Sequence, residues 1–285
     1  MIVVESDVSW FTLQPALAEA VETVADVVAG IPDPDRPAFA QWTVGDVAAH
    51  LSHAWLFIPR LAARDLAGGI AALPPTPEVG NGTPGGAAFA SLPALAPATV
   101  ALVRNDPERD PAVLADRIRT AAKAFAELDV TDSTVRPWMI EGVGGPPAHF
   151  AAHLLNETVV HGHDISRATG RARPVPDHLA ALVLRSFLLP MLCITNAAPF
   201  PAPWSVELRL AGESAYRLDA GAEGLRFRAA GGPSPDARLW IRPSAMLLLA
   251  WRRRSLASVI MGREALVWGR RPWVATRPLA IVPQV

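Results

Sequence analysis

The spacing of apolar residues changes near residues 171 to 176, and this change constrains the fold more than any other feature of the sequence. Before it, apolar residues recur at helical spacing; after Pro174 and Pro176, short runs alternate between apolar and polar residues, as in half-buried strands. At 285 residues, the chain is also about twice the size of a usual single domain. We therefore expect two domains, residues 1–173 and residues 174–285.

The spacing of apolar residues in the first half predicts helices joined by connectors rich in proline and glycine. Thr43 and Asp46 have the spacing of a capping box, which predicts that a helix begins there and runs towards Leu66. The connector at residues 68–97 predicts a long surface loop or lid. Four long helices, the third of them broken, favour an antiparallel four-helix bundle. The expected helical segments are 13–28, 43–66, 98–103 with 111–128, and 147–169.

The second half predicts a smaller α+β domain. Residues 177–196 and 244–251 have helical character, and the alternating runs between and after them are typical of antiparallel strands. The expected strands are 206–210, 225–228, 238–241 and 265–269.

Composition excludes several classes of protein. Hydrophobic residues make up 51% of the chain and charged residues 19%, which excludes a mainly disordered chain. The formal charge of -1 gives no electrostatic basis for binding nucleic acid. No signal-peptide pattern begins the chain, and the most apolar run, residues 179–194, contains Arg185 and Pro190 and reads as too short to span a bilayer. We expect a cytoplasmic monomer or homodimer that binds a small molecule and neither nucleic acid nor membrane.

Four side chains that can bind a metal recur at every fourth position of the last expected helix of the first half. A step of four residues rises about 6 Å and turns slightly past a full turn, so adjacent members of this series share a face and can bind one ion. Three consecutive members span about 12 Å, too far for one tetrahedral centre. The series contains three pairs of adjacent residues, and one of these pairs would be completed by a ligand from elsewhere, such as His50 or His53. The alternative is that the series is only a polar stripe that binds no metal. The series is His149, His153, Glu157 and His161.

Two motifs resemble those of a known family. The run Trp42 to Leu51 (WTVGDVAAHL) is similar to the opening signature of mycothiol-dependent maleylpyruvate isomerase N-terminal domains, which are DinB-like four-helix bundles. Glu157 to Ile165 (ETVVHGHDI), followed by Thr169 to Arg171, resembles the second signature of that family. The segments Arg242 to Arg253 and Val259 to Trp268 look like the sterol-carrier-like domain that accompanies this bundle, and they match more loosely.

The resemblance implies a ligand set and a cofactor. Carried over by position, His50, Glu157 and His161 hold a divalent metal, usually zinc, with an active cleft between the two domains. A thiol cofactor, mycothiol, would bind the metal as thiolate and attack an electrophilic small molecule, giving isomerisation or S-transfer. The chain departs from the family at His163, where an aromatic residue is common, and this puts the pocket wall in doubt.

Neighbouring residues gain candidate roles from this site. His53 and His153 are candidate catalytic groups, since an unperturbed histidine titrates near neutral pH. Arg252 and Arg253 are candidates for binding the cofactor, because the family uses an arginine of the second domain near its substrate. Two other functions remain open: a binding module for an apolar ligand with a structural metal, and a metal-dependent lyase or hydrolase that uses water and no thiol.

The single cysteine and the single lysine of the chain both fit the use of a small-molecule thiol such as mycothiol. Cys193 lies in an apolar run and is expected to be buried and inert, which fits a protein that borrows a small thiol. Lys123 is the only lysine, so arginine carries nearly all the positive charge. Such a bias is typical of GC-rich, actinobacterial-type genomes, where mycothiol is made.

Overall fold

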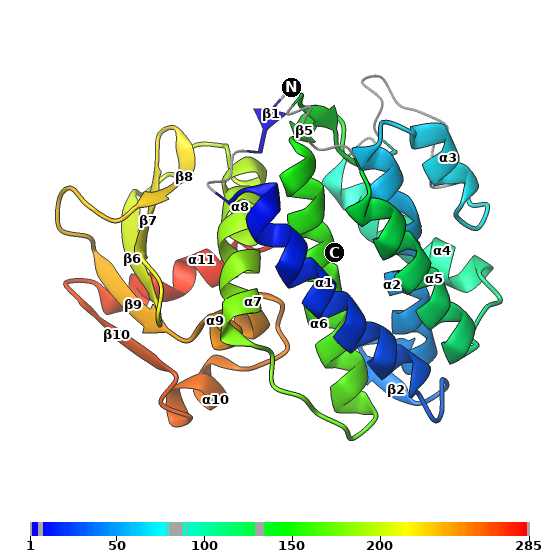
Figure 1. Cartoon of the computed structure of the whole chain (residues 1–285). Helices are drawn as coiled ribbons and strands as arrows, with labels where there is room; N and C mark the ends of the chain where they lie inside the picture. Colours follow the sequence, from blue (N-terminus) through cyan, green and yellow to red (C-terminus); the bar gives the residue numbers. More distant parts are fainter. Residues whose placement is uncertain are drawn as a thin grey trace. The chain divides into compact units, whose positions relative to one another are not determined.

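The protein combines helices with small sheets, and its chain forms two compact units. The structure is a computed structural model that describes residues 2–4, 8–77, 79, 88–89, 91–128 and 134–283. The boundary between the units falls between Val175 and Pro176 in the sequence. In Figure 1 the first unit consists mainly of long helices, whereas the second contains a five-stranded sheet with shorter helices.

Four long helices form the body of the first unit. Helices α1 and α2 each pack against both α5 and α6. The hydrophobic spacing predicted all four. Their bounds are Trp10–Ala29 for α1, Val44–Ala62 for α2, Pro111–Ala126 for α5 and Pro147–Ala168 for α6.

Capping side chains mark where α2 and α5 begin. Thr43 accepts a hydrogen bond from the backbone N–H of Asp46, and Asp46 accepts one from the backbone N–H of Thr43, so the predicted capping box is confirmed. Asp110 caps α5 by accepting the backbone N–H of Ala112, with Pro111 at the first position of the helix. The expected end of α2 near Leu66 is wrong: α2 ends at Ala62, and the left-handed backbone of Arg64 (φ 62°) separates it from a further helix.

The predicted lid, residues 68–97, is only partly within the described chain. Residues 78, 80–87 and 90 lie outside it. Where a loop was expected, α3 (Leu66–Ala71) and the short helix η1 (Leu92–Ala94) form, and α4 (Leu95–Asn105) follows directly. Asp65 caps α3 by accepting a hydrogen bond from the backbone N–H of Gly68, a local signal that the glycine content concealed.

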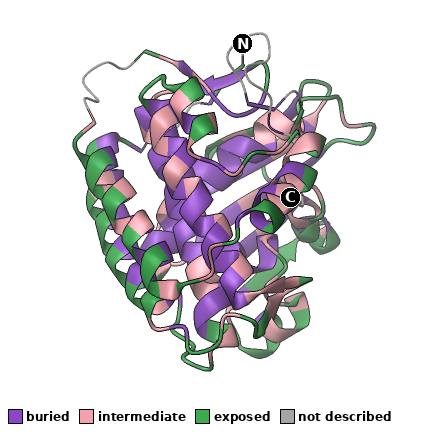
Figure 2. Ribbon diagram, turned by 90° about the vertical axis from the view of Figure 1, so that its right-hand side faces the viewer, coloured by how far each residue is buried: buried purple, intermediate pink, exposed green. Residues whose placement is uncertain are grey.

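The core of the first unit lies between the four long helices, where Figure 2 shows most of the buried residues of these helices. Leu51, Trp55 and Ile58 of α2 are almost fully buried, as are Phe150 and Leu154 of α6. Burying each such side chain contributes about 1.5–3 kcal/mol. Helix α6 also buries several polar side chains, which are costly unless partnered, so this helix is where a functional site is expected.

Two small sheets in the first unit were not predicted. Strands β1 (Ile2–Val3), β5 (Val143–Gly145) and β4 (Arg136–Pro137) form one, in the order β1-β5-β4, with β1 parallel to β5. Strands β2 (Pro37–Phe39) and β3 (Trp42–Thr43) form a short hairpin directly before α2. Strands of two or three residues are too short to show an alternating pattern.

The second unit begins with one continuous helical segment of 19 residues, Asp177–Thr195. It consists of α7 (Asp177–Val183), the π-helical turn η2 (Leu184–Leu188) and α8 (Leu189–Thr195). By length and composition alone this segment could cross a membrane, so the expectation that it is too short was wrong; 67% of its apolar window is buried inside the protein, as in a core helix.

The sheet of the second unit has the strand order β10-β9-β6-β7-β8. All four predicted strands are present, but β7 was missed, and β6 runs parallel to β9 where antiparallel pairing was expected. Alternation reports which face of a strand is buried and not the direction of its neighbour. Bounds in this sheet are Trp204–Leu210 for β6, Ala215–Gly221 for β7, Gly224–Ala229 for β8, Ala237–Ile241 for β9 and Ala265–Gly269 for β10.

Short helices complete the second unit. Helix α9 covers the segment predicted at residues 244–251 and is almost entirely buried. Asp177, at the start of α7, pairs with Arg242 (2.7 Å) and accepts the backbone N–H of Ser244, which joins α7 to the start of α9. The bounds are Pro243–Ala250 for α9, Leu256–Met261 for α10, Pro272–Thr276 for η3 and Arg277–Ala280 for α11.

Candidate metal centre

Helices α2 and α6 bring together the three side chains that the family resemblance implied as metal ligands. His50 lies on α2, whereas Glu157 and His161 lie one turn apart on α6. The two helices pack against each other, so the His50 ring faces the stripe on α6. One candidate ligand atom from each residue lies within 4.8 Å of the other two.

The distances between these atoms suit a small metal ion. Oε2 of Glu157 lies 3.1 Å from Nε2 of His50 and 3.4 Å from Nε2 of His161. A tetrahedral centre with bonds of about 2.0–2.1 Å puts its ligand atoms about 3.3–3.4 Å apart. Each of the three side chains keeps 14 to 18% of its surface exposed. The residues therefore fit a divalent ion with three protein ligands and one side open to a further ligand.

The charges at this site favour a cation. Burial opposes ionisation of Glu157, but hydrogen bonds from His153, His161 and His50 outweigh it and hold the pKa of Glu157 well below its usual value. Burial also opposes protonation of His161, yet its hydrogen bonds with Asp164 and Glu157 raise the pKa of His161 to about 9. The ionised carboxylate of Glu157 thus favours a positive charge beside it, whether on His161 or on a metal ion.

Two further residues of α6 orient the ligands. Asp164 is completely buried, and its Oδ2 lies 3.3 Å from Nδ1 of His161, which directs Nε2 of that ring towards Glu157. Asn156 donates a hydrogen bond from Nδ2 to Oε1 of Glu157 (3.1 Å), leaving Oε2 for the site. Neither role was predicted from the sequence: an asparagine next to a ligand carries no recognisable pattern, and Asp164 lies within the second family motif, which assigns it no contact.

His153 lies beside the site, and His149 lies further along α6. Nε2 of His153 is 3.5 Å from Oε1 of Glu157, on the side of the carboxylate away from His50. The rings of His149 and His153 both contact the buried ring of Trp138, at 5.2 and 5.4 Å between centroids. Burial lowers the pKa of His149 to about 3, so His149 is neutral at physiological pH. His153 is therefore in contact with a ligand, whereas His149 belongs to the core.

His53 pairs with a residue other than the three ligands. Its Nε2 lies 2.7 Å from Oδ2 of Asp106, and the side chain is almost fully buried. Burial lowers the pKa of His53 to about 4 against the opposing effect of Asp106, so the ring is neutral at pH 7. Because a carboxylate only accepts, the proton of this neutral ring is on Nε2. The other nitrogen, Nδ1, is buried and has no hydrogen-bond partner among the residues that the structure describes.

The candidate cofactor-binding arginines lie at the end of α9 in the second unit. Arg252 is exposed and has a left-handed backbone (φ 56°), and Arg253 donates a hydrogen bond to the carbonyl of Trp251. The adjacent Arg254 pairs through two nitrogens with both carboxylate oxygens of Glu264, at 2.7 and 2.9 Å. A cofactor-binding role for Arg252 and Arg253 stays a prediction.

Two solved structures with a similar fold come from one isomerase. A crystal structure of the mycothiol-dependent maleylpyruvate isomerase is similar over 90% of this chain and 94% of its own, with 12% identity and a TM-score of 0.50. A histidine-to-alanine mutant of that isomerase is similar over 90% and 93%, with 12% identity and a TM-score of 0.52. These likenesses show a shared fold.

The sequence itself gives the family. No curated protein matches it. Residues 13–166, more than half of the chain, match the mycothiol maleylpyruvate isomerase N-terminal domain, and this range contains His50, Glu157 and His161. The chain therefore belongs to the mycothiol-dependent maleylpyruvate isomerase family.

Proposed function

We propose that this protein is a divalent-metal-dependent enzyme that uses a small thiol, mycothiol, to isomerise an electrophilic small molecule or to transfer sulfur to it. The convergence of His50, Glu157 and His161 from two helices carries the proposal. Two imidazoles and one carboxylate are ligands that suit zinc, and a three-ligand site leaves a position for a cosubstrate. The family is named for a mycothiol-dependent reaction, and that name supports the choice of thiol.

The metal would supply one kind of chemistry: it would bind the cofactor sulfur and lower the pKa of the thiol, so that thiolate forms at neutral pH. The protein residues would hold and orient this centre. Asp164 fixes the ring of His161, and Asn156 fixes the carboxylate of Glu157. His153, in contact with Glu157, is the better placed of the two candidate proton-transfer groups, since Nε2 of His53 is bonded to Asp106 and its Nδ1 is buried.

The remaining parts of the proposal concern the whole chain. We propose that residues 1–173 form a DinB-like four-helix bundle that holds zinc, and that residues 174–285 form a sterol-carrier-like domain. Arg252 and Arg253 of that domain would bind the cofactor or a substrate carboxylate, since guanidinium groups pair well with carboxylates. The protein would act in the cytoplasm as a monomer or homodimer.

Metal analysis tests the ligand set. The purified chain, loaded with Zn²⁺ and dialysed, is expected to retain one ion per chain by elemental analysis. His50→Ala, Glu157→Ala and His161→Ala should each lose most of it, because two remaining ligands bind zinc far more weakly than three. His178→Ala is the matched control, since His178 is an exposed histidine of the second unit and should keep wild-type stoichiometry.

Metal analysis, together with a titration of the metal-loaded chain with mycothiol, separates the alternative functions. Retention of one ion per chain by all three ligand variants would show that the assignment is wrong. Retained metal without any binding of mycothiol would instead favour a lyase or hydrolase that uses water, or a binding module with a structural metal.

A further inference from the structure

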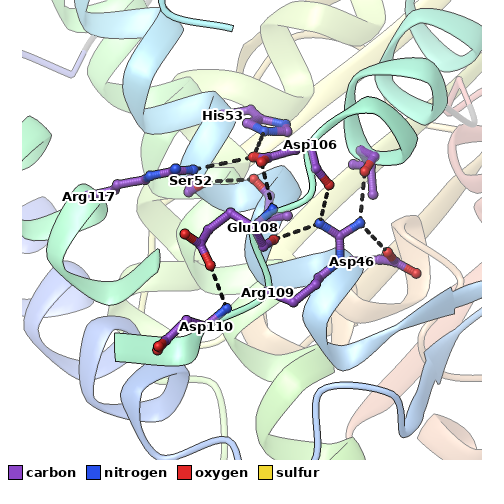
Figure 3. A network of polar contacts seen from close by, with 10 residues as sticks. Asp46, Ser52, His53, Asp106, Glu108, Arg109, Asp110 and Arg117 are labelled. Atoms are coloured by element: carbon purple, nitrogen blue, oxygen red, sulfur yellow. Dashed lines mark hydrogen bonds and ion pairs between the residues drawn. The ribbon is translucent and has the colours of Figure 1, made fainter. Parts of the chain in front are cut away.

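The segment between α4 and α5 contacts α2 on both sides of the proposed ligand His50. We call residues Asp106 to Asp110 the α4–α5 connection. Figure 3 shows two of its side chains, Asp106 and Arg109, reaching α2 at separate points. Asp46, His50 and His53 follow each other at steps of four and three residues, which places them along one stripe of α2. His50 is thus the middle residue of a stripe that the connection holds at both ends.

The first contact lies one turn after His50. Oδ2 of Asp106 accepts a hydrogen bond from Nε2 of His53 (2.7 Å). The same oxygen lies 3.3 Å from Nη1 of Arg117 of α5. Oδ1 of Asp106 accepts the backbone N–H of Glu108, which fixes the carboxylate within the connection. Asp106 and His53 are both more than nine-tenths buried, so water does not replace this hydrogen bond.

The second contact lies one turn before His50. Arg109 donates to Oδ1 of Asp46 (2.9 Å), while Oδ2 of Asp46 accepts the backbone N–H of Thr43 in the capping box. The same guanidinium donates to the carbonyls of Val103, Asp106 and Glu108, so it is fixed to the end of α4 and to the connection. A Cβ at Gly45 would lie 3.0 Å from Cδ of Arg109, which shows how closely the arginine crosses the first turn of α2.

Together the two contacts restrict how α2 can move. Sliding α2 along its axis, or rotating it, would break the bond of Asp106 with His53 or that of Arg109 with Asp46. The same movement would carry the His50 ring away from Glu157, whose Oε2 is only 3.1 Å from it. Ligand atoms must be held within a few tenths of an ångström for tight metal binding.

We propose that Asp106 and Arg109 are positioning residues for His50, and that they hold it in register with Glu157 and His161. The inference rests on the metal site proposed above. Neither residue touches the metal ligands directly, so their effect is transmitted through the backbone of α2. Outer partners of metal ligands typically change affinity about 10–100-fold when mutated, and an indirect effect belongs at the lower end of this range.

Metal binding by the full chain tests the proposal. Asp106→Ala and Arg109→Met should each still bind one Zn²⁺ per chain. Their affinity for Zn²⁺, measured by competition with a chromophoric chelator, should be about tenfold lower than that of the wild-type chain. The visible absorption of bound Co²⁺, which reports ligand geometry, should also change in both variants. His53→Gln, which keeps an N–H donor for Asp106, should restore most of the affinity that His53→Leu loses.

A matched control separates positioning from general destabilisation. Arg119→Ala removes the ion pair of α5 with Asp26 of α1 (2.7 Å) and leaves the bonds of Asp106 and Arg109 with α2 in place, so the affinity for Zn²⁺ and the Co²⁺ spectrum should stay at wild type. Wild-type affinity and spectrum in both Asp106→Ala and Arg109→Met would overturn the positioning role, and Arg109→Met decides alone if Asp106→Ala does not fold. A wild-type chain that binds neither Zn²⁺ nor Co²⁺ would contradict the metal site instead.

Discussion

At the scale of single residues, the carboxylate of Glu157 organises the site. Its Oε2 faces His50 and His161, and its Oε1 is held by Asn156 and lies near His153. Three histidines thus surround one ionised carboxylate, whose negative charge can be balanced either by a proton or by a metal ion. A divalent ion bound there would displace the proton from His161, whose pKa is raised to about 9 without metal.

In the proposed mechanism, the thiol comes from outside the chain. Burial raises the pKa of Cys193 to about 11, so about one molecule in a thousand carries the thiolate at pH 8. We predict that an aromatic disulfide reagent modifies Cys193 at least a hundredfold more slowly than a free cysteine at pH 8. Because the thiolate is the reactive form, the rate should rise about tenfold per pH unit between pH 8 and 10.

The same reagent applied to the chain in denaturant is the control, and there Cys193 should react like a free cysteine. A rate in the folded protein that levels off below pH 9 would mean that the thiol of the half-buried Cys193 ionises more easily than its surroundings predict. Cys193 would then be a candidate nucleophile of the protein itself.

At the scale of elements, the capping box fixes where the ligand-bearing helix α2 begins. Its two reciprocal hydrogen bonds satisfy backbone N–H groups that would otherwise lack partners. We predict that Thr43→Ala lowers the free energy of unfolding of the first unit by about 1 kcal/mol, measured with urea. Thr43→Ser, which keeps the hydroxyl, should recover most of the loss, and a Thr43→Ala variant as stable as wild type would contradict the importance of the cap.

Elements with local signals were predictable from the sequence, and elements that depend on distant partners were not. Helix α2 has its own cap and an apolar stripe, and α6 has 22 residues of helical periodicity. Strand β1 has two residues and exists only because it pairs with β5, more than a hundred positions away. Strand β7 was missed because its alternation is broken by Arg217, which is buried through a pair with Asp219 (2.7 Å).

The residues of the metal site were likewise predictable only where the signal is local. Spacing on α6 predicted a stripe of ligands but left three pairs open, because the pair that meets His50 depends on how α2 packs against α6. The family resemblance, and not the spacing, singled out Glu157 and His161. Asp106 and Arg109 gave no signal, since they contact α2 only through tertiary structure.

At the scale of the whole molecule, all three proposed ligands belong to the first unit. Metal binding should therefore stabilise that unit selectively. At a free Zn²⁺ concentration of 100 times the dissociation constant, the expected gain is about 2.7 kcal/mol. We predict that hydrogen exchange of the full chain slows up to about a hundredfold in α2 and α6 on addition of Zn²⁺, while exchange in strands β6 to β9 is unchanged.

The variant Glu157→Ala provides the comparison, because Zn²⁺ should not protect its α2 and α6. Equal protection of the sheet and of the helices by Zn²⁺ in the wild-type chain would mean that the ion binds elsewhere or that the two units unfold together.

The proposed function depends most directly on whether the sulfur of mycothiol binds the metal. The Co²⁺-loaded chain is titrated with mycothiol while its near-ultraviolet absorption is recorded, with S-methylated mycothiol as the control that lacks a free thiol. We predict that a sulfur-to-cobalt charge-transfer band grows to saturation at one mycothiol per chain and is absent with the S-methylated compound. A chain that binds one Co²⁺ and shows no such band at saturating mycothiol would contradict the thiol mechanism.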